Sequence, residues 1–261
     1  MKLYPGDVCA HPYIRGLVYV ANLLINNGLY KVFLVLFTKK MILLSEIADF
    51  NSLKIDNLKN IQKMENVTNV FNLLILDESG SMYSMKHAAV SGINEIIQTM
   101  KNMEKAYPEQ KHFFTLLTFN SNGFVFRYNN VRVSDIKEYG DEDFQPDALT
   151  PLYDAIGKGM NELSRNVGKE DHVVVNIITD GLENDSKEYG SSTIKNIIES
   201  KKAMGWQIAY IGANQDAKAV ADGMHIDDSC DFDATPNGIN NMMLKRRQIY
   251  VNYSKELNEK I

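Results

Sequence analysis

Cysteine is scarce in this sequence of 261 residues, and there is no excess of positive charge. Only two cysteines occur, Cys9 and Cys230, and their separation does not indicate a disulfide framework or a zinc knuckle. The formal net charge of -5 provides no field that would attract DNA or RNA, and the basic run at residues 245–247 is interpreted as the solvated face of a C-terminal helix. We therefore expect no nucleic-acid partner and a reducing compartment, the cytoplasm.

The motifs of several enzyme classes are also missing. No G-x-G-x-x-G follows an apolar run, no Walker-type lysine loop is present, and D-E-S-G-S at residues 77–81 lacks the first glycine of a G-x-S-x-G elbow. The five histidines show no metal-ligand spacing. The sequence thus gives little support to catalysis, and we expect a protein that is not an enzyme.

The first 66 residues differ in character from the rest, and we expect them to form an N-terminal extension. Residues 17–37 are apolar and long enough to permit a membrane span. However, Asn26-Asn27-Gly28 is a turn signal, so residues 18–25 and 30–37 could each be a short strand or a buried helical piece. A secretory signal is less favoured because no small-residue cleavage pattern follows. A third interpretation makes Met64 the physiological start.

From Val67 onward, short apolar strands alternate with amphipathic helical stretches. Strands are predicted at residues 70–76, 113–119, 173–178 and 206–211, and helices at residues 84–105, 152–164, 195–204, 216–223 and 238–257. Residues 123–128 can return as a hairpin partner at the sheet edge. This order predicts a Rossmann-like, doubly wound α/β domain over residues 67–261. Its central sheet would be mostly parallel with one antiparallel edge strand, and helices would cover both faces.

Three loops at the carboxyl edge of this predicted sheet carry side chains with oxygen atoms. Asp77, Ser79 and Ser81 follow the first strand, Thr150 precedes a helix, and Asp180 follows the central strand. Any one loop could equally be a helix cap or a turn. Together they offer only carboxylate and hydroxyl oxygens, which suit a hard divalent cation.

The strings D-x-S-x-S at residues 77–81, T-P-L at residues 150–152 and T-D-G at residues 179–181 resemble the von Willebrand factor A (vWA) domain. They correspond, in the same order, to its complete metal-ion-dependent adhesion site. The resemblance implies that Ser79, Ser81 and Thr150 contact Mg²⁺, or Mn²⁺ in its place. It also implies that Asp77 and Asp180 hold the ion directly or through water.

The same resemblance implies a protein-binding module, in which an Asp or Glu carboxylate of a partner protein completes the coordination of the metal. The alternative is a metal-dependent hydrolase that uses the same carboxylates and hydroxyls. Two further loops at this edge supply candidate rim residues, Asn120, Asn214 and Gln215, although each could be an ordinary turn residue. With no disulfides or secretory features, the resemblance suggests a stand-alone member of bacterial or phage type.

Overall fold

The computed structural model describes residue 19 and residues 30–65, 67–213 and 215–259. Contacts divide the chain into two compact units, Met1–Glu65 and Asn66–Ile261. Each unit is described by itself.

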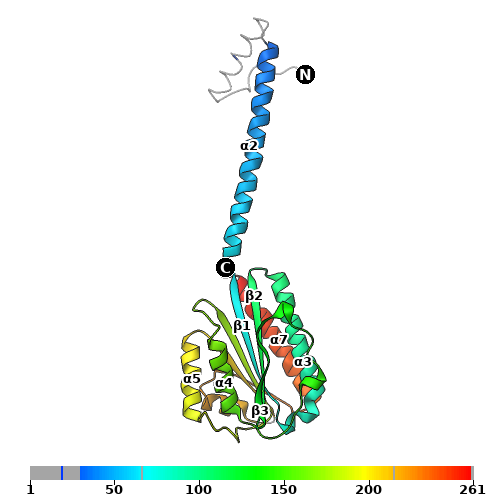
Figure 1. The fold of residues 1–261 in the computed structure, drawn as a ribbon, viewed down its shortest axis with the longest axis vertical. Coiled ribbons are helices and arrows are strands. Elements are labelled where there is room, and N and C mark those ends of the chain that lie inside the picture. Colours follow the sequence, from blue (N-terminus) through cyan, green and yellow to red (C-terminus); the bar gives the residue numbers. More distant parts are fainter. Residues whose placement is uncertain (1–18, 20–29, 66, 214, 260–261) are drawn as a thin grey trace, which may run out of the picture. The chain divides into compact units, whose positions relative to one another are not determined.

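The described part of the first unit includes a long helix, α2 (Tyr30–Glu65), of 36 residues (Figure 1). The segment contains no glycine or proline, so nothing in it interrupts a helix. Residues 30–37 are helical, as one of the two alternatives had it, but a short strand is wrong and so is burial, because Val35, Leu36 and Phe37 are exposed. Among the described residues, no helix is long and apolar enough to cross a membrane. Most of the predicted 18–25 segment lies outside the described residues.

The second unit is built on a six-stranded sheet in the order β3-β2-β1-β4-β5-β6. Its strands are β1 (Thr68–Asp77), β2 (Gln110–Asn120), β3 (Gly123–Arg132), β4 (His172–Thr179), β5 (Gln207–Ala213) and β6 (Asp228–Phe232). All neighbouring pairs are parallel except β2 and β3, which form an antiparallel hairpin at one edge. This confirms the predicted fold class. The edge strand β6 was not predicted, because D-S-C-D-F has no apolar run.

Helices cover both faces of the sheet (Figure 1). They are α3 (Lys86–Ala106), α4 (Leu152–Ser164), α5 (Ser191–Ala203), α6 (Ala217–Gly223) and α7 (Pro236–Asn258). Helices α3 and α7 enclose one apolar core with the sheet, and α4, α5 and α6 enclose the other. A Cβ atom on Gly92 of α3 would lie 2.5 Å from Cγ of Met243 in α7, so glycine lets these two helices approach closely.

Polar side chains join α7 to the centre of the sheet. Arg246 is buried, and its guanidinium donates hydrogen bonds of 2.9 Å to Oδ1 of Asn176 in β4 and to Oδ2 of Asp228 in β6. Asn176 also donates a 2.5 Å hydrogen bond to the hydroxyl of Tyr250. The interpretation of residues 245–247 as a solvated face is therefore wrong for Arg246. Consecutive helical residues point about 100° apart, so three in a row do not share one face.

A buried histidine adds a second polar contact between α7 and the sheet. His112 lies in β2, with Nε2 3.2 Å from Oγ of Ser254 and with no hydrogen-bond partner for Nδ1 among the described residues. Burial, together with the neighbouring positive charge of Arg132, lowers the pKa of His112 from its usual value of 6.5 to about 4. The neutral imidazole is therefore the form that the folded domain accommodates.

We expect a chain that begins at Met64 to fold without the preceding residues. Among the described residues, one apolar core begins at Leu74 and the other at Phe71, and neither extends beyond Leu257. Circular dichroism should record a cooperative thermal transition close to that of the full chain. An insoluble or unfolded product would show that residues before Met64 contribute to the core.

We expect His112→Gln to weaken the pH dependence of stability. Unfolded histidine binds a proton near pH 6.5 but the folded form only near pH 4, so the stabilisation is complete above pH 6.5 and is lost as the pH falls to 4. This loss is on the order of 3 kcal/mol, and the neutral glutamine removes it. Urea unfolding of both proteins at several pH values across this window measures the difference. Equal slopes in the two proteins would contradict the assignment.

Candidate functional site

The site begins where two central strands end. Asp77 is the last residue of β1, and its side chain is fully buried. Its Oδ1 accepts a 2.7 Å hydrogen bond from the backbone N–H of Ser79, and its Oδ2 accepts a 2.5 Å hydrogen bond from the hydroxyl of Thr179, the last residue of β4. One carboxylate thus joins the loops that leave two parallel strands.

The other candidate ligands follow in a connected series. Oγ of Ser79 lies 3.2 Å from Oγ of Ser81, which donates a 2.6 Å hydrogen bond to Oδ1 of Asp180. A Cβ atom on Gly181 would lie 2.8 Å from Oγ1 of Thr150, so the third loop also reaches this point. The structure therefore brings all three predicted loops together. Ser79 and Thr150 are buried, whereas Ser81 is exposed and Asp180 partly so, which opens the site on their side.

These separations fit a small hard cation. Adjacent oxygen ligands of an octahedral Mg²⁺ lie about 3.0 Å apart, given metal–oxygen distances near 2.1 Å. The oxygen atoms of Ser79 and Ser81, and those of Ser81 and Asp180, are separated by 3.2 and 2.6 Å, on either side of that value. In the described part of the chain, no group of three or more His, Cys, Asp or Glu side chains could hold a metal. A cation here would depend on the hydroxyl oxygens as well as on two carboxylates.

The electrostatics of the two carboxylates favour a positive neighbour. The pKa of Asp77 is raised to about 6, because burial, with a smaller contribution from the charge of Asp180, outweighs the lowering by hydrogen bonds from Thr179 and Ser79. Burial also raises the pKa of Asp180, against the hydrogen bond from Ser81. Negative charge is therefore poorly solvated at both positions, and a divalent cation would stabilise it.

Glu78 anchors the β1 loop from the side away from the candidate ligands. Its buried carboxylate accepts hydrogen bonds of 3.2 Å from Arg127 of β3 at both oxygens, and a 2.5 Å hydrogen bond from the backbone N–H of Gln145. Its own N–H donates to the carbonyl of Phe119 at 2.8 Å. This role of Glu78 was not predicted from the sequence, because Glu78 occupies a variable position of D-x-S-x-S.

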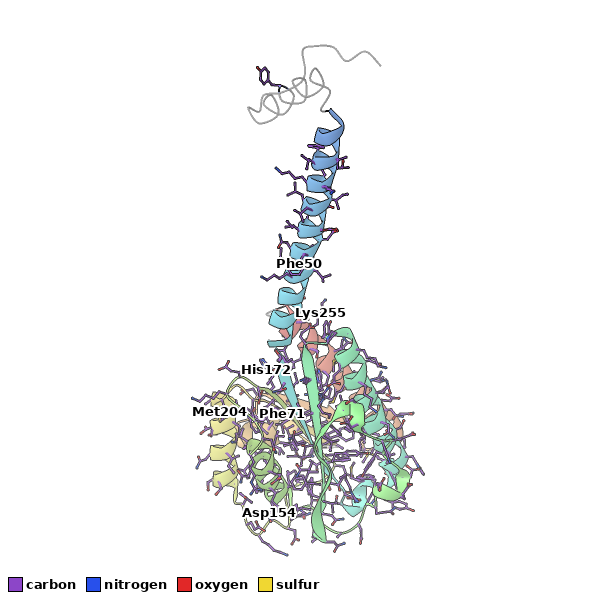
Figure 2. The ribbon with its side chains drawn as sticks, turned by 45° about the horizontal axis from the view of Figure 1, so that its top comes forward. Phe50, Phe71, Asp154, His172, Met204 and Lys255 are labelled. Atoms are coloured by element: carbon purple, nitrogen blue, oxygen red, sulfur yellow. The ribbon has the colours of Figure 1, made fainter. Side chains whose placement is uncertain are left out.

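Side chains also fasten the loop after β4 to the Thr150 segment. Oδ1 of Asn184 accepts a 2.9 Å hydrogen bond from the N–H of Thr150, and the N–H of Asn184 donates to the Thr150 carbonyl at 3.2 Å. Buried Asp154, labelled in Figure 2, accepts hydrogen bonds from the backbone N–H groups of residues 187–189 at 2.8–2.9 Å. Neither Asn184 nor Asp154 was predicted from the sequence. Their spacing from the motifs offers no signal, because their partners are backbone groups of another loop.

The rim residues mostly make contacts within the chain. Asn120 donates a 3.1 Å hydrogen bond to the carbonyl of Glu78 and accepts one of 2.9 Å from the N–H of Asn122. Oε1 of Gln215 accepts a 3.3 Å hydrogen bond from the hydroxyl of Tyr210. Asn214 lies outside the described residues. A role for these three in partner binding stays a prediction.

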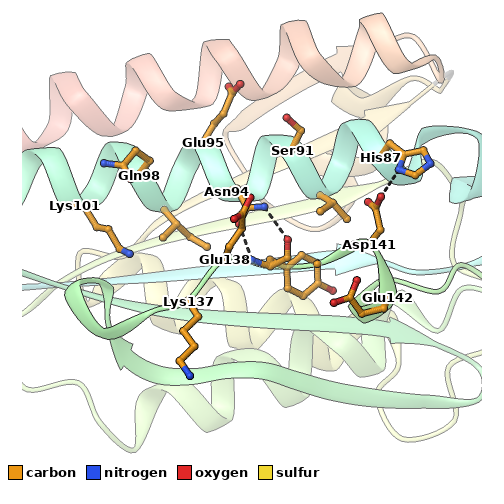
Figure 3. A pocket seen from close by; sticks show the side chains of 14 residues that line it. His87, Ser91, Asn94, Glu95, Gln98, Lys101, Lys137, Glu138, Asp141 and Glu142 are labelled. Carbon is orange, nitrogen blue, oxygen red and sulfur yellow. Dashed lines mark hydrogen bonds and ion pairs between the residues drawn. The ribbon is translucent and has the colours of Figure 1, made fainter.

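A groove of about 900 Å³ lies between α3 and the segment at residues 137–142 (Figure 3). The side-chain amide of Asn94 donates a 2.8 Å hydrogen bond to the carbonyl of Tyr139 and accepts one of 2.8 Å from the Tyr139 N–H. Nδ1 of His87 lies 2.5 Å from Oδ2 of Asp141. None of the five candidate ligands lines this groove. It is therefore separate from the candidate metal site.

The sequence matches no family model and no curated protein. Among solved structures, it is similar to the vWF domain of the pilus tip protein Mfa5 from Porphyromonas gingivalis (TM-score 0.50, 10% identity, covering 71% of this chain and 95% of that one). The chain has a vWA-like fold. This confirms the resemblance at the level of fold.

Two other solved structures are similar to this chain over 70% of its length. One is the pilus adhesin SpaC from Lactobacillus rhamnosus GG (TM-score 0.54, 12% identity, covering 70% of this chain and 30% of that one). The other is proximal thread matrix protein 1 from the mussel byssus (TM-score 0.51, 15% identity, covering 70% and 46%). This chain therefore spans less than half the length of either protein. The bacterial or phage origin and the cytoplasmic location stay predictions.

We expect isothermal titration calorimetry to show one site for Mg²⁺ or Mn²⁺, weakened at least about tenfold in Asp77→Asn and in Asp180→Asn. Each substitution removes a charge worth more than 1 kcal/mol to a nearby cation. Asp222→Asn, an exposed aspartate paired with Lys218 on α6, is the matched control and should bind as the unaltered protein does. Undiminished binding in both site variants would place the metal elsewhere. Thermal melts should accompany each titration, because Asp77 is buried.

Proposed function

We propose that this domain is a divalent-metal-dependent protein-binding module. Mg²⁺ is the preferred ion, with Mn²⁺ as a substitute. Ser79, Ser81 and Thr150 would contact it, and Asp77 and Asp180 would hold it directly or through water. The observation that carries this proposal is the convergence of hydroxyl and carboxylate side chains from three loops, with the oxygens of Ser79, Ser81 and Asp180 at separations close to those around an octahedral ion.

The charge balance of this ligand set explains why a partner would bind. Three of the five side chains are neutral hydroxyls, so the ion would keep more of its positive charge than in an all-carboxylate site. The bound ion would then supply an electrophilic position for a further oxygen ligand. Ser81 is exposed and Asp180 partly exposed, so that position would be accessible from solvent. A protein partner that presents an Asp or Glu carboxylate would supply the missing ligand and neutralise the remaining charge.

Metal-dependent hydrolysis is less well supported by the same geometry. A hydrolase needs a group beside the metal that accepts a proton from water. Both oxygens of Asp77 already accept hydrogen bonds, and Asp180 accepts one from Ser81. Glu78, which is next in sequence, is paired with Arg127. The structural neighbours, which include a pilus adhesin and a pilus tip protein, agree better with a binding role.

Affinity capture tests the proposal. We expect the immobilised full chain to retain a protein partner in Mg²⁺ and to release it in EDTA, as quantified by mass spectrometry. Thr150→Ala and the double variant Ser79→Ala with Ser81→Ala should lose the partner, because each removes hydroxyl ligands. Ser91→Ala with Ser134→Ala, at two exposed serines away from the site, is the matched control.

Retention in EDTA and in the double serine variant would contradict the proposal. Recognition would then have to involve another surface of the domain. Melting profiles that match the unaltered protein are needed for each variant, because Ser79 and Thr150 are buried.

A further inference from the structure

Large apolar side chains are exposed on all three loops of the candidate metal site. Tyr83 is 73% exposed, Leu149 52% and Leu182 58%. They lie two residues after Ser81, one before Thr150 and two after Asp180, respectively. We name these three residues the apolar collar. Isolated exposed apolar residues are normal on a protein surface, but here each of three loops that meet at one site carries one.

The backbone holds the collar residues in place. Leu149 exchanges two 3.0 Å hydrogen bonds with Ser121, through the Leu149 N–H to Oγ and through the Ser121 N–H to the Leu149 carbonyl. The residue before it, Ala148, has a φ of 63°, a left-handed conformation that is uncommon for residues other than glycine. The collar side chain of this loop is therefore presented by a fixed turn.

Tyr83 is presented in a comparable way. It lies in the short 3₁₀ helix η1 (Gly80–Met85), between Met82 and Met85, which are both completely buried. The two methionines fix this helix on the core, so the side chain of Tyr83 is left on the outer face. Tyrosine and leucine side chains that are rigidly presented at the surface are common anchors of protein interfaces.

We propose that the partner's acidic residue is flanked by large apolar side chains, which pack against the apolar collar while the carboxylate binds the metal. This inference rests on the proposed function. Apolar contacts around the ion would exclude water, and lower local polarity strengthens the attraction between a cation and a carboxylate. The collar therefore selects, among all exposed acidic residues, those within an apolar segment of another protein.

A pair of displayed peptide libraries tests the composition of that segment. One library has random residues on both sides of a fixed Asp, and the other has a fixed Asn in its place. Both are selected on the immobilised full chain in Mg²⁺ and again in EDTA. The selections are repeated on a collar variant, Tyr83→Ser with Leu149→Ser and Leu182→Ser.

A matched control carries Met204→Ser with Leu244→Ser. These residues are 57% and 52% exposed, and neither is on a loop of the candidate site. Figure 2 shows Met204 at the side of this domain, apart from Asp154, which is in the first turn of the helix after Thr150. The control removes exposed apolar surface without changing the collar.

We expect the Asp library to be enriched over the Asn library in Mg²⁺ alone, with large apolar residues beside the Asp. The collar variant should lose on the order of tenfold in affinity for the selected peptides, equal to about 1.4 kcal/mol. The control should keep its affinity. Calorimetry should show unchanged Mn²⁺ binding by the collar variant, because its side chains are not ligands.

The contrary outcomes separate the inference from the proposed function. Enrichment of Asp without apolar neighbours, or equal binding by the collar variant, would overturn the proposed role of the collar and leave the proposed metal–carboxylate contact intact. Lack of any preference for Asp over Asn would overturn both. Equal selection of apolar peptides in EDTA would overturn the link between collar and metal. Mg²⁺-dependent self-association, lost in the collar variant, would make a second copy of the chain the occupant instead.

Discussion

The candidate site depends on the hydrogen bonds that the carboxylate of Asp77 accepts. It is buried at the end of β1 and receives one hydrogen bond from its own loop and one from Thr179 at the end of β4. These contacts fix the loop with Ser79 and Ser81 relative to the loop with Asp180. A buried carboxylate is costly unless it is well paired, and burial has raised the pKa of Asp77. The same carboxylate thus fixes the positions of the loops, and its buried negative charge would be stabilised by a nearby cation.

Carboxylates and amides that are not candidate ligands hold the rest of the site. Glu78 fixes the β1 loop to β3 through Arg127, Asp154 binds three consecutive backbone N–H groups of the loop after β4, and Asn184 pairs with the backbone of Thr150. Each satisfies backbone donors that would otherwise be left unpaired in loops packed against the core. The oxygen cluster is consequently positioned by the protein itself, and the collar residues are carried on the same fixed loops.

Much of the fold could be predicted from the sequence because its elements have strong periodic signals. The bounds of α4 match the predicted helix, and β1, β2 and β4 extend the predicted apolar runs by one to three residues at each end. Strand β5 begins one residue after the predicted start and ends two residues after the predicted end. The residues of the three loops were predicted from short motifs, and the parallel order of the strands explains why they meet. The edge strand β6 could not be predicted, since it is short and half polar. The buried positions of Arg246 and Glu78 depend on partners far away in sequence, and local patterns carry no information about such pairs.

The polar contacts between α7 and the sheet also constrain the order in which the domain can form during synthesis. Asn176 lies in the central strand β4, yet its side chain is satisfied by Arg246 and Tyr250, about seventy residues later in the chain. Until α7 has left the ribosome, one face of the sheet lacks one of its two covering helices and the buried amide of Asn176 lacks its partners on α7. Packing of the domain is therefore completed only when α7 docks on the sheet. A nascent chain that lacks α7 would expose both apolar surface and an unpaired polar group.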